Sequence, residues 1–103
     1  KSGPMNYTYK KDFEWNQAKS EACFTARGFD FEYVSSAFSD ENRLIWEDIR
    51  FQYGESRYQM LGKIQSRVFA VAYTYRLNMI RIISAHKANI REVERYENSH
   101  ATD

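Results

Sequence analysis

The chain is poor in the residue types that form disulfides, metal clusters and sharp turns. Its 103 residues include a single cysteine, Cys23, one proline and four glycines. One cysteine excludes an internal disulfide and a cysteine-based zinc cluster, and the shortage of proline and glycine excludes collagen-like and low-complexity chains. No apolar run approaches the ~20 residues that a membrane helix needs. The sequence therefore predicts a soluble, cytoplasmic protein without a cofactor, a bound metal or a membrane partner.

Length and composition favour one folded domain. About 100 residues is near the commonest domain size and is enough for one packed core. Hydrophobic residues make up 43% of the chain and aromatic residues 17%. The first four residues, Lys1-Ser2-Gly3-Pro4 before Met5, look like a remnant of an expression tag. We therefore expect a single domain over residues 5–98, followed by a frayed tail at 99–103.

Charge is divided unevenly along the chain, although the formal net charge is only +1. Residues 1–55 hold seven Lys or Arg and ten Asp or Glu, whereas residues 56–103 hold eight and four. From Ser56 through Arg91 there are seven Lys or Arg and no acidic residue. Such a basic stretch favours phosphate binding, but basic side chains also protect strand edges against aggregation. Charge alone leaves both interpretations open.

The order of helix and strand signals predicts an α+β fold with two N-terminal helices, an antiparallel sheet of about four strands and a C-terminal helix. Asn16 and Asp30 are suitable N-caps, and Gly28 is a suitable residue to end the first helix. Asn89 and Glu92 form a capping box for the last helix. β-branched and aromatic residues predict strands at 43–47, 57–62, 67–75 and 79–85, and residues 7–15 are expected to be a short extended piece.

Helical spacing also predicts which side chains of the two N-terminal helices face the sheet. The first helix is expected to bury a stripe of small residues that lets it lie close to the sheet. The second is expected to bury larger apolar residues. The two sets are Ala18, Ala22 and Ala26 in the first helix, and Phe31, Val34, Ala37 and Phe38 in the second.

Alternation along the strands sorts their side chains into two faces. If 63–66 and 75–78 are four-residue hairpin loops, Met60 faces Phe69 and Ala72 faces Arg81. One face is then large and apolar, with Tyr58, Met60, Phe69, Val71, Tyr73, Ile80 and Ile82. The other face carries Arg57, Gln59, Ala70, Ala72, Thr74, Arg81 and Ile83. Two arginines beside small residues predict an open trough for a phosphodiester; the alternative is that another helix covers this face.

Short motifs stand in a characteristic order from residue 13 to residue 98. They are Phe13-Glu14-Trp15-Asn16, Gly28-Phe29-Asp30-Phe31, Ile45-Trp46-Glu47-Asp48, Tyr53-Gly54-Glu55, Arg57-Tyr58, Leu61-Gly62, Val71-Ala72-Tyr73-Thr74, Ile80-Arg81-Ile82-Ile83-Ser84-Ala85, Arg91-Glu92 and Arg95-Tyr96-Glu97. Each motif is short, but in this order and spacing the chain resembles the BrnT family of toxins.

The resemblance implies a RelE-like fold and a toxin of a type II toxin–antitoxin system. Such a toxin is a metal-independent ribonuclease that cleaves RNA and inhibits translation and growth. Its partner would be a BrnA-type ribbon-helix-helix antitoxin, through which alone the toxin would reach DNA. The chain departs from the family at Arg27 and Phe51, where many members have His, and at His86, where many have Arg. These departures keep an alternative open: a non-catalytic module of the same fold that binds nucleic acid or antitoxin.

Metal-independent RNA cleavage needs a base for the 2′-hydroxyl, cations for the phosphorane charge and an acid for the leaving oxygen. Arg57 and Arg81 suit the charge-stabilising role, because guanidinium binds phosphate in a bidentate way. His86 is the candidate acid or base, although it could equally be a solvated side chain at a strand end. Glu55 and Glu47 are alternative bases, or else salt-bridge partners of arginine.

Further residues are candidates for holding the RNA. Basic and polar side chains could anchor its backbone, and an aromatic ring could stack on a base. The candidate RNA-binding residues are Lys87, Arg67, Arg91, Gln59 and Tyr96. Arg67 falls on the apolar face at a strand end and ranks lower, and Tyr96, like Tyr73, could instead belong to the core.

Overall fold

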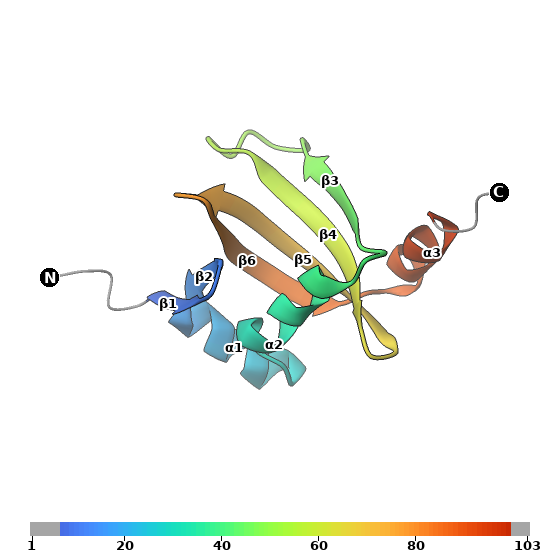
Figure 1. Cartoon of the computed structure of the whole chain (residues 1–103), viewed down its shortest axis with the longest axis horizontal. Helices are drawn as coiled ribbons and strands as arrows, with labels where there is room; N and C mark the ends of the chain where they lie inside the picture. The colour runs from blue at the N-terminus through green and yellow to red at the C-terminus, as the bar shows by residue number, and fades with distance from the viewer. Residues whose placement is uncertain (1–6, 100–103) are drawn as a thin grey trace, which may run out of the picture.

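The computed structural model describes residues 7–99, whose three α-helices pack against one six-stranded sheet (Figure 1). The strands lie in the order β1-β2-β6-β5-β4-β3. They are β1 (Tyr7–Lys10), β2 (Phe13–Asn16), β3 (Leu44–Asp48), β4 (Arg57–Ile64), β5 (Arg67–Arg76) and β6 (Met79–Lys87). The helices are α1 (Gln17–Arg27), α2 (Phe31–Ser35) with the 3-10 turn η1 (Ser36–Ser39), and α3 (Ile90–Asn98). The predicted tag remnant at 1–4 and the tail from residue 100 lie outside the described residues.

The sheet is larger than the sequence predicted, and it is mixed rather than purely antiparallel. Residues 7–15, expected to be one short extended piece, form most of the β1–β2 hairpin, and β2 then pairs in parallel with β6. This pairing places Glu14 beside Arg81, 67 positions away along the chain. No local pattern indicates so distant a partner. The prediction of about four antiparallel strands was therefore wrong, whereas the α+β class and the three helices are confirmed.

The helix ends follow the capping residues that the sequence predicted. The Asn16 side chain accepts a hydrogen bond from the Lys19 N–H, and Gly28 ends α1 in the left-handed conformation at φ 88°. Asp30 accepts from the Tyr33 N–H at the start of α2. Both bonds of the predicted capping box are present at the start of α3. These ends are set by local hydrogen bonding, so a local pattern suffices to find them.

Both central hairpin turns are two residues shorter than predicted. The turns consist of residues 65–66 and 77–78, because Ile64 pairs with Arg67 and Arg76 with Met79. Two-residue hairpins need left-handed residues and usually use glycine; here Gln65, Leu77 and Asn78 adopt positive φ instead. Met60 consequently faces Val71 rather than Phe69. A slip of two residues keeps side chains on their predicted faces, because strand side chains alternate with period two. Ile83 is an exception: it is left unpaired by a bulge in β6 and lines a hollow with Ala22 and Cys23 of α1, so its predicted place on the other face was wrong.

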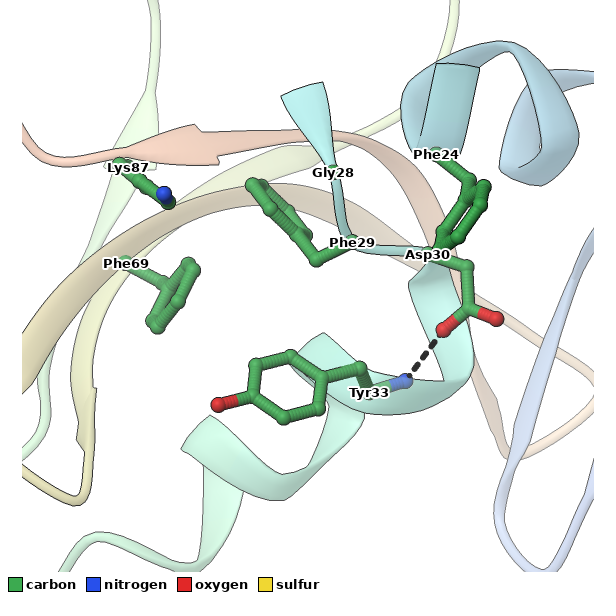
Figure 2. A pocket seen from close by; sticks show the side chains of 7 residues that line it. All are labelled: Phe24, Gly28, Phe29, Asp30, Tyr33, Phe69 and Lys87. Carbon is green, nitrogen blue, oxygen red and sulfur yellow. Dashed lines mark hydrogen bonds between the residues drawn. The ribbon is translucent and has the colours of Figure 1, made fainter. Parts of the chain in front are cut away.

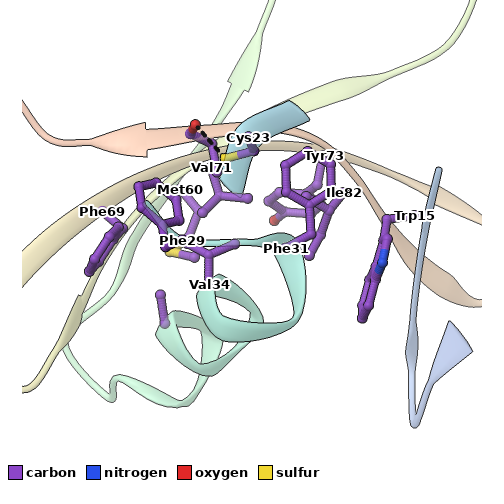
Figure 3. Close-up of a cluster of buried hydrophobic side chains, with 12 residues drawn as sticks. Trp15, Cys23, Phe29, Phe31, Val34, Met60, Phe69, Val71, Tyr73 and Ile82 are labelled. Atoms are coloured by element: carbon purple, nitrogen blue, oxygen red, sulfur yellow. Dashed lines mark hydrogen bonds between the residues drawn. The ribbon is translucent and has the colours of Figure 1, made fainter. Parts of the chain in front are cut away.

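The predicted apolar face forms the main core, under α1 and α2 (Figure 3). Met60, Val71 and Tyr73 are at most 1% exposed, and burial raises the pKa of the Tyr73 hydroxyl above its usual range. The predicted buried residues of the second helix are confirmed: Phe31, Val34 and Ala37 are buried, and Phe38 packs against the same core. Among the residues described, no helix is long and apolar enough to cross a membrane.

The predicted alanine stripe of α1 was wrong, because Ala18, Ala22 and Ala26 are exposed. The helix instead turns Ser20 and Cys23 inward. The Ser20 hydroxyl accepts a hydrogen bond from the Phe31 N–H at 2.9 Å, which satisfies a donor at the start of α2. The buried face of α1 is therefore the one that carries the Ser20–Phe31 hydrogen bond. The prediction considered only the size of the side chains and missed this bond.

The second face of the sheet is covered at one end only. At that end α3 packs through Tyr96 and Val93 on a small cluster that includes Leu61 and Ala70. Ala72 remains partly exposed, so the predicted trough is open in its middle and closed at Ala70. A bulge in β6 also shifts the register, and Ala72 pairs with Ser84 while Arg81 pairs with Thr74. The predicted pairing of Ala72 with Arg81 was therefore wrong.

Candidate nucleic-acid interface

The open face of the sheet, opposite α1 and α2, carries polar side chains in successive rungs. One rung is set by the pairs Asp48–Arg57 and Thr74–Arg81, and Glu14 extends it beyond Arg81. The register of β4 and β5, extended by one residue, places Arg57 beside Thr74. With strands spaced ~4.8 Å apart, the Cα atoms of Arg57 and Arg81 lie about 10 Å apart across β5. The two predicted arginines therefore share a face, and no helix covers them.

Arg57 is held between a carboxylate and an aromatic ring. Its Nε lies 3.5 Å from Oε2 of Glu55, and its guanidinium sits 4.3 Å from the centre of the Tyr53 ring. The Nε atom is buried and has no hydrogen-bond partner among residues 7–99. Since 37% of the Glu55 side chain is exposed, this carboxylate is free to move aside. An incoming phosphate oxygen can then take its place on the guanidinium.

Arg81 has the same kind of neighbours but is held more tightly. Its Nη1 donates to Oε2 of Glu14 at 3.3 Å, and its guanidinium lies 4.2 Å from the centre of the Tyr7 ring. Only 17% of the Arg81 side chain and 8% of the Glu14 side chain are exposed. Burial lowers the pKa of Arg81 from its usual value. Arg81 is therefore less available to a ligand than Arg57, because its acidic partner is buried with it.

Asp48 organises the loop that follows β3. Its carboxylate accepts hydrogen bonds from Nε and Nη2 of Arg50, at 2.8 and 2.7 Å, and from the Tyr53 hydroxyl and Gln59 Nε2. These hydrogen bonds, of which those from Arg50 have the largest effect, hold the pKa of Asp48 well below its usual range. The Asp48 carboxylate in turn raises the pKa of Arg50. The predicted RNA-binding residue Gln59 is thus fixed by Asp48, and the exposed Arg50 guanidinium is positioned beside it.

His86 lies next to α3 and is bound by the helix cap. Its Nε2 is 3.0 Å from Oε1 of Glu92, and that same oxygen accepts a hydrogen bond from the Asn89 N–H at 2.9 Å. The two side chains line a hollow of about 460 Å³ between α3 and β3–β4, together with Trp46, Glu47, Asp48, Ile49, Arg50, Gln59 and Arg95. The Arg95 guanidinium covers the Trp46 ring at 3.7 Å. The hollow thus combines an oriented imidazole, two guanidinium groups, an aromatic ring and three carboxylates, among them that of the predicted alternative base Glu47.

The four predicted catalytic residues do not converge on one point. His86 and Arg81 are five positions apart on β6, which places their Cα atoms roughly 15 Å from each other. Arg57 and Glu55 lie with Arg81 at the far end of the face from α3. The open face therefore has an arginine end and a histidine end, and one phosphate cannot contact both.

The remaining predicted RNA-binding residues lie elsewhere. Lys87 and Arg67 are exposed on the opposite face, next to Phe69. Arg91 is exposed on the first turn of α3. Tyr96 is buried under α3, where burial and its hydrogen bond to Asp40 raise its pKa to about 12. A buried ring cannot stack on a base. Tyr96 therefore belongs to the core, which was the alternative interpretation of this residue.

The site also contains residues that the sequence reasoning did not select. They are Tyr7, Glu14, Trp46, Asp48, Arg50, Tyr53, Glu92 and Arg95. Glu92 was identified as a helix cap but not as a partner of His86. The spacing of Asp48 and Arg50 was a usable signal, because an Asp side chain can hydrogen-bond to the residue two positions further along the chain. Among residues 7–99, no group of three or more His, Cys, Asp or Glu side chains could hold a metal ion.

Comparison with known families decides the class of protein. Residues 15–92 match the family described as "Ribonuclease toxin, BrnT, of type II toxin-antitoxin system". The chain belongs to the BrnT family. The match spans more than half of the chain and contains Arg57, Arg81 and His86. No curated protein matches the chain.

Membership of the BrnT family makes the chain a ribonuclease toxin of a type II toxin–antitoxin system, which implies an RNA target and an antitoxin partner. Three of the residues that complete the site lie outside the matched segment: Tyr7 and Glu14, which contact Arg81, and Arg95, which covers Trp46. The BrnT match thus includes Arg57, Arg81 and His86 but not all of the residues that surround them.

Proposed function

We propose that this toxin cleaves RNA without a metal ion, on the open face of its sheet. The carrying observation is that Arg57, Gln59 and His86 all project from the face that α1 and α2 leave uncovered. The cleavage inhibits translation and growth in the cytoplasm, and a BrnA-type antitoxin neutralises it. Family membership supports the ribonuclease and the antitoxin; the geometry of the face supports the path of the RNA.

The reacting phosphate is proposed to lie in the hollow beside His86. The 2′-hydroxyl attacks the adjacent phosphorus while the bond to the 5′-oxygen breaks, which gives a 2′,3′-cyclic phosphate and a 5′-hydroxyl end. An imidazole can take up the first proton or supply the second, and Glu92 fixes the orientation of the ring at 3.0 Å. The guanidinium groups of Arg50 and Arg95 supply the positive charge that the phosphorane requires.

Arg57 is proposed to hold the RNA backbone at the other end of the face, on the same strand as Gln59. Guanidinium recognises a phosphate with two parallel hydrogen bonds, and the exposed Glu55 can yield its place. Arg81 is paired with the buried Glu14, which offsets its charge, so Arg57 is the cation of this end that an RNA phosphate can reach. The Trp46 ring offers a stacking surface for a base near the reacting phosphate once Arg95 moves.

The test is cleavage of a defined RNA by the purified toxin in excess chelator, with kcat and KM measured separately. We expect His86→Ala to lower kcat by about 10²–10⁴-fold, the usual contribution of a general acid or base. Arg57→Ala should mainly raise KM, because it removes binding remote from the reacting bond. Lys19→Ala, an exposed lysine on α1, is the matched control and should change neither constant.

Several outcomes would contradict this assignment. If His86→Ala keeps full activity, the hollow is not the reacting centre, and Glu55 beside Arg57 becomes the base to test. If the wild type binds RNA but leaves it intact with and without metal, the chain is a binding module. Growth arrest on expression, relieved by His86→Ala, would link the cleavage to the toxic effect.

A further inference from the structure

An apolar pocket lies on the face of the molecule opposite the proposed RNA path. It is formed by the end of α1, the start of α2, the start of β5 and the end of β6 (Figure 2). It has a volume of about 390 Å³ and is lined by Phe24, Gly28, Phe29, Asp30, Tyr33, Phe69 and Lys87. None of these side chains takes part in the hollow beside His86. The pocket is therefore a second, separate concave surface.

The floor of the pocket is buried and its rim is exposed. Phe29 and Phe69 are only 6% and 3% exposed, and their rings meet edge to face at 5.0 Å. Tyr33 packs on Phe69 in the same way at 5.8 Å yet is 44% exposed, and Phe24 is 57% exposed. Exposed aromatic side chains around a buried aromatic floor are typical of the anchoring pockets of protein interfaces, where one large side chain of the partner inserts.

The two charged residues of the lining, Lys87 and Asp30, lie on opposite sides of the pocket (Figure 2). Figure 2 shows the Lys87 ammonium turned toward the ring of Phe29, and among residues 7–99 this group makes no salt bridge. Arg67 lies two residues before Phe69 on the same strand and is exposed. The one carboxylate of the lining, Asp30, lies across the pocket at the start of α2, where it accepts the Tyr33 N–H at 2.8 Å. A partner with an acidic group beside its apolar anchor would complement the side of the pocket that carries Lys87 and Arg67.

We propose that this pocket anchors the antitoxin, through a segment that places one large apolar side chain on Phe29 and Phe69 and a carboxylate on Lys87. The inference rests on the proposed neutralisation by a protein antitoxin. It explains why Lys87 and Arg67, both basic and both exposed, lie away from the RNA face. The antitoxin can then bind this chain on a face that the RNA does not use.

The test compares two properties of the same variants: affinity for the purified antitoxin encoded beside the toxin gene, and RNA cleavage by the free toxin. Phe24→Ala should weaken antitoxin binding by about 30-fold or more, as expected for an aromatic anchor of an interface, with RNA cleavage unchanged. Leu77→Ala is the matched control, because Leu77 is 90% exposed at the β5–β6 turn, away from the pocket. It should bind the antitoxin like the wild type.

A second variant tests the charge. Lys87→Glu should slow association with the antitoxin about tenfold, whereas Lys11→Glu, an exposed lysine of the β1–β2 turn, should not. Wild-type affinity in both Phe24→Ala and Lys87→Glu would overturn the proposal, as would a wild type that does not bind this antitoxin. Loss of RNA cleavage with antitoxin binding intact would assign the pocket to RNA instead. A Phe24-dependent doubling of mass in the free toxin would assign it to a second copy of the chain.

Failure of the proposed function looks different. If the wild type binds antitoxin in a Phe24-dependent way but cleaves no RNA, the pocket assignment stands and the reaction does not.

Discussion

On one face of the sheet Met60, Val71 and Tyr73 are almost completely excluded from water, while on the other Gln59, Ala72 and His86, which come from the same three-strand block, remain partly accessible. The first face receives α1 and α2; the second receives α3 at one end only. Alternation thus lets neighbouring residues of one strand serve stability and ligand binding separately. The comparison also has an exception, because one ion pair on the open face, Arg81–Glu14, is largely buried.

The largest expected effect on stability comes from that exception. Arg81→Ala removes the partner of the buried Glu14 carboxylate, and leaving such a charge unpaired typically costs about 3–5 kcal/mol of the free energy of unfolding. Urea unfolding measures the loss. The double variant Glu14→Gln with Arg81→Ala should recover part of it, and Arg76→Ala, an exposed arginine of the same face, should be nearly neutral. If Arg81→Ala unfolded at the same urea concentration as the wild type, the Arg81–Glu14 pair would not contribute to stability.

A cavity on the covered face should have an effect of similar or slightly smaller size. Met60 is completely buried, so Met60→Ala should lower the free energy of unfolding by about 2–5 kcal/mol. RNA cleavage by the fraction that remains folded should be unchanged. Met79→Ala, at the partly exposed start of β6, is the control and should cost much less. Equal losses for the two methionines would contradict the division of the faces.

The contact between β4 and η1 should respond to a single methyl group. A Cβ at position 62 would lie 2.5 Å from the Ala37 carbonyl oxygen and 2.8 Å from Sδ of Met60. The methionine can move but the backbone of η1 resists, so Gly62→Ala should cost about 1–3 kcal/mol, measured by thermal unfolding. An unchanged melting temperature would show that η1 can shift away from the sheet.

The smallest loss of stability is expected for Asp48→Asn, because the Arg50 guanidinium that binds both carboxylate oxygens of Asp48 is 67% exposed and solvent screens the ion pair. The loss should be seen at neutral pH and should shrink in acid, where the wild-type carboxylate becomes protonated. The folded-state pKa of Asp48 is lowered from 3.8, so the carboxylate contributes stability above that value and the contribution is lost as the pH falls below it. Unfolding between pH 6 and pH 3 should therefore be less pH-dependent in the variant. Identical pH profiles would remove Asp48 as the organiser of its loop.

Local features of the fold could be predicted from the sequence, and distant pairings could not. The caps at Asn16, Asp30 and Asn89 depend on bonds within three residues, and the faces depend on alternation alone. The parallel pairing of β2 with β6 joins segments 67 residues apart. The short turns lack glycine, and of their left-handed residues Gln65, Leu77 and Asn78 only Asn78 is a type that favours positive φ.

The same limit applies to the candidate site. Alternation placed Arg57, Gln59 and Arg81 on one face, as the structure does. The groups that control them come from segments remote in sequence, such as Glu14 and Tyr7 for Arg81. Acidic and basic residues are concentrated in different parts of the sequence, but the fold brings them together. The acidic β2 and β3 lie on either side of the basic central strands of the sheet. Composition therefore overstates the positive field of the open face.

One carboxylate, that of Glu92, closes the first turn of α3 and also orients the imidazole of His86. Unfolding of α3, which is nine residues long, would break both contacts at once. Heat, a protease or a binding partner that unfolds α3 would therefore remove the contact that orients the His86 imidazole before the sheet itself is disturbed.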